Sequence, residues 1–206
     1  MPISLFLNEK FIKFAHEKAI KVEHMNEKLI LSEDGKAVLE ADHSIIHAVI
    51  PEGVTKIGKD SFNGSQISSV IIPEGVEEIG YGAFRNTYKL SEVQLPHSLK
   101  IIGDTAFAAT GLVSLHIPEG VTEIGGAAFF NSRALRHISI PSTVNKILNP
   151  FMAVELHDAH IYVRDLERLE IVGHINCKYL YVPSGMLEAY KRHPVFGEIE
   201  NIVEIE

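Results

Sequence analysis

Apolar residues recur along this chain in a phrase that repeats at nearly constant intervals. The phrase is clearest from Ile117 to Phe129, where isoleucine, proline, glutamate and glycine are followed by a spaced pair of apolar residues. Its proline occurs five times, 22 or 23 residues apart, at Pro51, Pro73, Pro96, Pro118 and Pro141. A fixed period of this length is typical of a solenoid, in which each repeat forms one coil and stacks on its neighbours.

The residues before each proline predict a short strand. In the fourth copy, Leu112, Leu115 and Ile117 are apolar, and the same three offsets are apolar before every other repeated proline. Alternate residues of a strand point to the same side of a sheet, so the last two of these positions should face the core. The L-x-x-L-x-L run therefore predicts a parallel β-sheet on one face of the solenoid, with one strand from each coil.

The residues after each proline predict the return half of the coil. The fourth copy continues with the apolar pair Val121 and Ile124, then Gly125, the aromatic Phe129 and the small hydroxyl residue Ser132. We expect the glycine to mark a sharp turn, because glycine takes positive φ without steric cost. The phenylalanines of successive coils should stack in the core, and each hydroxyl should bond backbone groups where the chain turns.

These residues resemble one family specifically. The phrase I-P-E-G-V-x-x-I-G-x-x-A-F, followed by a small residue and L-x-x-L-x-L, is similar to the BspA-like (Treponema pallidum type) leucine-rich repeats of bacteria over residues 45–163. The resemblance implies a mostly β fold with short helical turns, a leucine-rich-repeat solenoid of 22–23-residue repeats with atypical capping ends. It also implies a binding role, and it carries over no catalytic residue because the family motif contains none.

The two ends depart from the repeat and predict caps around one structural unit. Residues 1–44 should form an N-terminal cap, with a short helix and a strand within 8–24 followed by a β-hairpin whose turn is Asp34-Gly35. Residues 45–183 should form the solenoid, and residues 184–206 a C-terminal cap of a helix and a strand. Caps are needed because an open solenoid end exposes core residues and a strand edge.

The repeat decays after Pro141. At the offsets used by the earlier copies, Leu148 replaces the glycine, Met152 takes the phenylalanine position and Glu155 the hydroxyl position. The next strand lacks a proline at its end, where Arg164 stands as the equivalent residue. These departures predict that the last coils are less regular than the first four.

Composition and charge narrow the possible partners. The 206-residue chain has a net charge of −8 and a pI near 5.8, which argues against nucleic acid or an anionic membrane as a partner. Cys177 is the only cysteine, so no internal disulfide is possible. It falls in the first apolar position before Pro183, where it should be buried. No cofactor motif is present, so we expect no cofactor.

The first residues predict no export signal. The stretch from Met1 to Glu9 has no basic region, and its apolar run is shorter than a signal peptide needs. No run approaches the ~18 apolar residues of a membrane helix. The sequence as written therefore predicts a cytoplasmic protein, with a cell-surface or secreted location as the alternative, because relatives of this repeat class are often exposed at the surface.

The outward residues of the predicted strands form the main candidate binding surface. They occupy the second and fourth positions before each proline or its equivalent, and strands about 4.8 Å apart would join them in one ribbon. The C-terminal half of this ribbon is rich in rings, at His116, His137, His160, Tyr162, Tyr179 and Tyr181. Tyrosine combines flat apolar area with a hydrogen-bonding tip, a combination favoured at protein interfaces. The alternative interpretation is structural, because aromatic residues also stabilise neighbouring strands.

Metal ligation is not predicted. His157 and His160 are three residues apart, so on a regular strand they should face opposite sides of the sheet. His137 and His160 would lie on adjacent strands, but that pair has no carboxylate or cysteine support. No metal-binding or catalytic residue is therefore assigned.

The sequence thus predicts a non-catalytic protein–protein interaction module that binds an unidentified protein through its exposed strand face, with a monomer favoured. One alternative is a cell-surface adhesin of the same fold that binds a host or matrix protein. An alternative from another class is a metal-dependent or hydrolytic enzyme built on the histidine and tyrosine ribbon.

Overall fold

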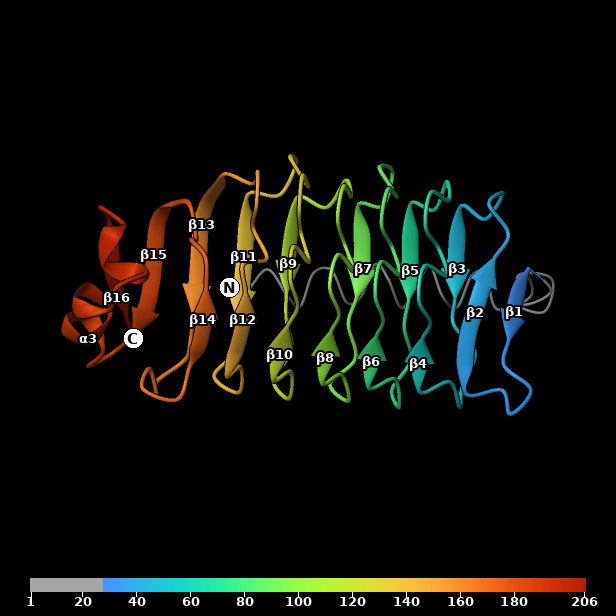
Figure 1. Cartoon of the computed structure of the whole chain (residues 1–206), viewed down its shortest axis with the longest axis horizontal. Helices are drawn as coiled ribbons and strands as arrows, with labels where there is room; N and C mark the ends of the chain where they lie inside the picture. The colour runs from blue at the N-terminus through green and yellow to red at the C-terminus, as the bar shows by residue number, and fades with distance from the viewer. Residues whose placement is uncertain (1–27) are drawn as a thin grey trace.

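The computed structural model describes residues 28–206, whose coils stack side by side along one long axis (Figure 1). The helix and strand predicted within residues 8–24 lie outside the described residues. The predicted hairpin is present, because β1 (Leu29–Leu31) pairs antiparallel with β2 (Ala37–Ala41). Its turn uses Gly35 at a φ of 70°, a backbone conformation that favours glycine.

The residues before each proline form the predicted parallel strands, one in each coil. They make two separate pieces of sheet, and no backbone ladder joins β7 to β9. The first piece contains β3 (His47–Val49), β5 (Ser69–Ile71) and β7 (Glu92–Gln94), and the second contains β9 (Ser114–His116), β11 (His137–Ile140), β13 (Leu156–Ile161), β15 (Cys177–Pro183) and β16 (Ile202–Ile205). The leucine-rich-repeat solenoid predicted from the period is therefore confirmed.

A second parallel sheet, which the sequence analysis did not predict, is formed by the residues after each proline. It continues from β1 and β2 through β4 (Lys56–Ile57), β6 (Glu78–Ile79), β8 (Ile101–Ile102), β10 (Glu123–Ile124), β12 (Lys146–Leu148) and β14 (Glu170–Val172). The isoleucine at the end of each two-residue strand is fully buried. These short strands pair residue for residue between successive coils, so their backbone groups bond across coils.

The phenylalanines stack in a single column through the core, as predicted. Phe62, Phe84, Phe107 and Phe129 are fully buried, and their ring centroids lie 5.0, 5.3 and 5.9 Å apart. The planes of successive rings differ by 21°, 10° and 7°, so the rings are stacked rather than edge-to-face. The column ties each coil to the next through apolar contact.

The column continues into the fifth coil through Phe151, and the prediction that Met152 takes this position is wrong. Phe151 stacks on Phe129 at 5.4 Å, whereas Met152 is 46% exposed. The reason is a one-residue shortening of this coil. In the fourth coil the residue at positive φ is Ala127, and in the fifth coil it is Asn149. Asn149 is one residue closer to the proline of its coil than Ala127 is. Every later position moves with it.

The hydroxyl residues behind the phenylalanines bond the backbone in two of the coils, as predicted. The Thr87 hydroxyl donates to the Phe84 carbonyl at 2.6 Å, and the Ser132 hydroxyl donates to the Phe107 carbonyl at 2.8 Å. The buried Ser65 hydroxyl has no hydrogen-bond partner among residues 28–206. In the shortened fifth coil this position is Val154, which is buried, rather than the predicted Glu155.

The glycine that follows the second apolar residue of each pair is needed for close packing between coils, and the predicted positive φ is wrong. Within the repeat phrase, the glycine that follows Pro-Glu has the positive φ instead, as at Gly53 and Gly120. A Cβ added to Gly103 would lie 2.9 Å from the carbonyl oxygen of Ile79 and from the carbonyl carbon of Gly80. The coils approach so closely here that no side chain fits.

Replacing Gly103 with alanine is therefore expected to lower the free energy of unfolding by about 1–3 kcal/mol, as overpacking does. Gly126→Ala is the matched control, because its added Cβ would meet Asp104 at 3.4 Å, an ordinary contact, at a φ that is not positive. Urea denaturation measures both changes. Equal losses in the two variants would show that contact between coils does not select the glycine.

The C-terminal end carries the predicted helix and strand. The helix α3 (Leu187–Arg192) and the 3-10 turn η2 (Phe196–Glu198) precede β16, which pairs with β15 at the end of the stack (Figure 1). Ser184 does not cap the helix as predicted. Met186 is the N-cap residue, and its side chain makes no capping hydrogen bond. The helix is held instead by its buried face.

Candidate functional site

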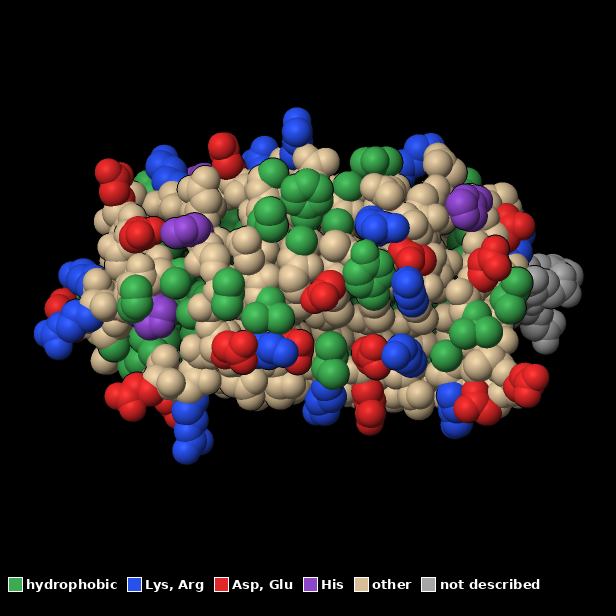
Figure 2. Space-filling view, in the orientation of Figure 1, with side chains coloured by type: hydrophobic (Ala, Val, Ile, Leu, Met, Phe, Trp, Pro, Cys, Tyr) green, Lys and Arg blue, Asp and Glu red, His purple; other side chains and the backbone are tan. Residues whose placement is uncertain are grey.

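The outward side of the eight-stranded sheet carries paired charges between neighbouring strands. Lys56 on β4 lies 2.8 Å from Glu78 on β6, and Lys146 on β12 lies 3.0 Å from Glu123 on β10. Acidic and basic side chains are interspersed across the view in Figure 2, without a large field of one sign. Exposed pairs of this kind contribute little to stability, and they leave this side with no concentrated chemistry.

The outward side of β11, β13 and β15 is different, because it collects imidazole and phenol rings. The ladder aligns His137 with Asp158 and Tyr179 in one row. It aligns Ser139 with His160 and Tyr181 in the next row. The sequence prediction had placed His160 in the row of His137, which is wrong by two residues.

The error comes from the missing proline of this coil. Ile161 aligns with Ile140, so Tyr162 stands at the position of Pro141, and Arg164 is not the proline equivalent. Tyr162 therefore lies just beyond the last residue of β13 rather than among its outward residues. Its side chain is 36% exposed.

Two consecutive residues of β13 point outward, His157 and Asp158. The burial pattern of the strand shows Leu156, Ala159 and Ile161 buried, with the residues between them exposed or half-buried. This is the L-x-x-L part of the repeat, where two residues in a row lie outside the core. His157 and His160 therefore share one side of the strand, and the prediction that they face opposite sides is wrong.

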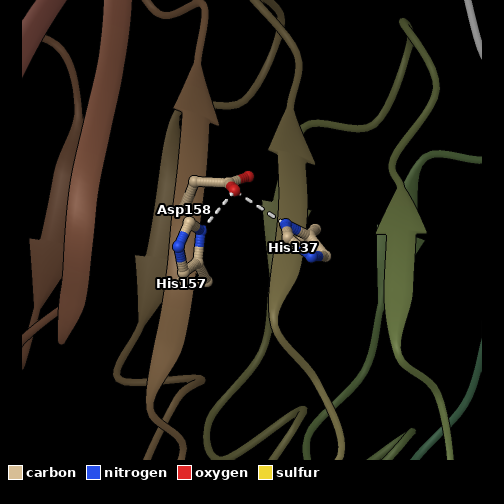
Figure 3. Close-up of side chains that lie close together, drawn as sticks. All are labelled: His137, His157 and Asp158. Carbon is tan, nitrogen blue, oxygen red and sulfur yellow. Dashed lines mark hydrogen bonds and ion pairs between the residues drawn. The ribbon is translucent and has the colours of Figure 1, made fainter.

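Asp158 is the centre of a cluster with three histidines. Its Oδ2 lies 2.7 Å from Nδ1 of His137 and 3.0 Å from Nδ1 of His157 (Figure 3). Its other oxygen, Oδ1, lies 3.7 Å from Nε2 of His160, beyond hydrogen-bond reach. One nitrogen from each of His137 and His157 and one oxygen of Asp158 all lie within 4.8 Å of one another.

Two members of the cluster, Asp158 and His160, have shifted pKa values. Partial burial raises the pKa of Asp158, but hydrogen bonds from His157 and His137 outweigh it, so the pKa lies below its ordinary value. The carboxylate is therefore ionised at neutral pH and accepts from both Nδ1 atoms. Burial lowers the pKa of His160 and favours its neutral ring. The negative charge of Asp158 acts in the opposite direction but is the smaller effect.

Five rings on this side form a continuous chain of contacts. His137 contacts His157 at 5.7 Å between centroids, and His157 contacts Tyr179 at 5.6 Å. Tyr179 contacts Tyr181 at 6.4 Å, and Tyr181 stacks on His160 at 4.5 Å with an 18° angle between planes. We call the set His137, His157, His160, Tyr179 and Tyr181, with Asp158 among them, the ring face.

The ring face contains four of the six residues proposed from the sequence. His116 lies on β9 opposite Ser139, and within residues 28–206 neither it nor Tyr162 makes a ring contact with the others. His157 and Asp158 were missed. The signal for both was present, because they are the two central residues of the run Leu156-His157-Asp158-Ala159.

Cys177 lies at the start of β15 and packs against the core while remaining partly exposed. Burial, together with the nearby Asp158 charge, raises the pKa of its thiol to about 12. The thiol is therefore protonated at neutral pH and is a poor nucleophile. This agrees with the packing role expected from the sequence, although the burial is incomplete.

The repeat pattern and the stacked coils identify the family. Residues 35–152, more than half of the chain, match the model of the BspA type Leucine rich repeat region in six copies. The chain belongs to the BspA-type leucine-rich repeat family. The BspA-type match ends before β13, so Asp158 and the rings of β13 and β15 lie outside the matched segment.

Solved structures support the same BspA-type fold. The pneumococcal vaccine antigen PcpA superposes with a TM-score of 0.71 at 21% identity, over 86% of this chain and 46% of that one. A leucine-rich cell surface protein from Faecalibacterium prausnitzii gives 0.60 at 26% identity, over 71% and 41%. The leucine-rich repeat protein of T. pallidum gives 0.58 at 19% identity, over 84% and 91%. The chain thus spans less than half the length of the first two.

No curated protein matches this chain in sequence. In the part of the chain that the structure describes, no helix is both long and apolar enough to cross a membrane. The family and fold assignments therefore come from the repeat pattern and from bacterial leucine-rich repeat structures.

Proposed function

We propose that this protein is a non-catalytic interaction module that binds a protein partner through the ring face. The observation that carries the proposal is the unbroken contact from His137 through His157, Tyr179 and Tyr181 to His160 on three adjacent strands. These rings are partly exposed and lie outside the core.

The chemistry of the ring face suits a protein partner. Tyrosine and other aromatic residues are enriched at the centres of protein interfaces, where a few of them supply most of the binding energy. The rings are already in contact with one another, so little side-chain entropy remains to be lost on binding. The net charge of −8 does not favour nucleic acid, whose backbone selects basic surfaces.

The cell surface is the location we favour over the cytoplasmic one expected from the sequence. The F. prausnitzii relative, 26% identical, is described as a cell surface protein. On this basis an adhesin that binds a host or matrix protein is the second candidate function. Fractionation of the native protein, with protease treatment of intact cells, separates the two. Protection from protease in intact cells would contradict the adhesin.

The test of the ring face compares two double variants with the wild-type chain. Tyr179→Ala with Tyr181→Ala removes two anchors, whereas Tyr81→Ala with Tyr88→Ala removes two exposed tyrosines (43% and 69%) that lie outside the ring face. Each variant is used for affinity capture from the source cells and from host matrix extract, with quantitative mass spectrometry. A partner of the ring face should be captured by the wild type and the Tyr81/Tyr88 control.

Capture by the Tyr179/Tyr181 variant should fall by more than about tenfold, because anchors of this kind contribute ~2 kcal/mol or more each. Thermal melting of both variants should stay cooperative. A partner that is lost from the Tyr81/Tyr88 variant and kept by the Tyr179/Tyr181 variant would place the interface elsewhere on the solenoid.

A further inference from the structure

We infer that His137, His157 and Asp158 form a binding site for a divalent first-row transition-metal ion of the Zn²⁺ class. The three side chains come from two adjacent strands, β11 and β13, and converge on one point in front of the sheet (Figure 3). The inference is independent of the protein-binding proposal, because it concerns the affinity of the chain for the metal alone.

The donor set is of the kind that such ions prefer. Imidazole nitrogen suits zinc, copper and nickel, and two histidines with one carboxylate is a common ligand set for zinc. Magnesium and calcium prefer oxygen ligands, and Asp158 is the only side chain of this site that offers one. Three protein ligands leave one position of a tetrahedral ion open to water.

The distances require only small movements. Metal–ligand bonds of about 2.1 Å place tetrahedral ligand atoms about 3.4 Å apart. Oδ2 of Asp158 now lies 2.7 and 3.0 Å from the two Nδ1 atoms, so each of these separations widens by less than about 1 Å. The side chains of His137 and His157 are 48% and 51% exposed, so their rings can rotate without disturbing the core.

The protons at the site balance. Each Nδ1 now donates to the carboxylate, and the other nitrogen of each ring takes no part in that bond (Figure 3). When the metal binds, a neutral imidazole moves its single proton from Nδ1 to Nε2 and offers the Nδ1 lone pair. The carboxylate exchanges two hydrogen bonds for one metal bond. No oxidation or covalent change is involved.

Asp158 is prepared for this role by its surroundings. Its side chain is only 16% exposed, and its Oδ2 is hydrogen-bonded to Nδ1 of both histidines. His160 lies 3.7 Å from its second oxygen and stacks on Tyr181, so it limits rotation of the carboxylate. A negative charge fixed between two imidazoles pre-organises the ligand set, which reduces the cost of ordering it on binding.

The test is isothermal titration of the full chain, pre-treated with EDTA and dialysed, with ZnCl₂ at neutral pH. Asp158→Asn keeps the shape of the side chain and removes its charge, and His157→Ala removes one nitrogen ligand from an exposed position. His174→Ala is the matched control, because His174 also pairs with a carboxylate, Glu198 at 3.2 Å, but belongs to no cluster of three ligands among residues 28–206.

The wild type and His174→Ala should bind one equivalent of Zn²⁺ with equal affinity. Asp158→Asn and His157→Ala should each weaken this binding by more than about tenfold, since losing even an outer-shell partner costs that much. MgCl₂ should produce no binding heat. The inference would be overturned if the wild type showed no saturable zinc binding. It would also be overturned if Asp158→Asn and His157→Ala both bound zinc as tightly as the wild type, or if the wild type bound magnesium as tightly as zinc.

Discussion

Replacing Phe107 with alanine is expected to lower the free energy of unfolding by about 3–5 kcal/mol, the cost of deleting a large aromatic side chain from a packed core. Phe107 is fully buried between Phe84 and Phe129, at 5.3 and 5.9 Å between ring centroids. The cavity cannot close easily, because the backbone bonds between neighbouring coils hold their spacing. Chemical denaturation monitored by far-ultraviolet circular dichroism measures the loss.

Phe130→Ala is the control for this prediction. Phe130 is the next residue after a column member, but it is 42% exposed, so its removal leaves no cavity. We expect a change of about 0.5 kcal/mol or less, as for most surface substitutions. A loss for Phe107→Ala as small as that for Phe130→Ala would mean that the phenylalanine column does not hold the coils together.

Deleting residues 184–206 is expected to abolish the monomeric, cooperatively folded state. This segment covers the end of the stack with the fully buried Tyr190 and Phe196, and its strand β16 pairs with β15. The single proton of the Tyr190 hydroxyl is shared between the Val163 carbonyl at 2.7 Å and the Ile161 carbonyl at 3.2 Å. Without the segment, Leu180 and Val182 lose their cover and β15 becomes a free edge, which promotes association.

Size-exclusion chromatography with light scattering, together with thermal melting, tests this expectation. Tyr190→Phe is the graded control, because it keeps the ring and removes only the two hydrogen bonds. It should remain monomeric and lose about 1–3 kcal/mol, the cost of leaving buried carbonyls unpaired. A truncated chain that is monomeric and melts as the full chain does would show that the stack needs no C-terminal cap.

Local sequence patterns were sufficient to predict the coils. The 22–23-residue period, the apolar offsets before Pro118 and the column of Phe62, Phe84, Phe107 and Phe129 each correspond to a feature of the structure. These patterns could be recognised in the sequence because each coil buries side chains at the same positions. Where one residue is missing, before Asn149, the offset fails and Phe151 rather than Met152 joins the column.

The glycine column was identified correctly for a wrong reason. The sequence shows that a glycine stands at the position of Gly103 in the earlier coils as well. Two explanations fit this pattern, a positive φ or the lack of space for a Cβ. Only the position of the preceding coil distinguishes them. Its backbone lies 2.9 Å from the place where the Cβ would be.

The chain's sequence by itself therefore determined the period, the buried positions of the coils and the solenoid architecture, because these depend on residues close together in the chain.

The tertiary structure decided which residues meet across coils. His137 and Asp158 are 21 residues apart, and their contact depends on the register between β11 and β13. That register follows from backbone hydrogen bonds between coils, and without the proline marker the sequence placed it two residues away. A shift of two residues keeps every side chain on its own side of the sheet but changes its neighbours. Four of the six predicted residues are therefore on the ring face, while their pairing, and with it the carboxylate between two histidines, required the folded chain.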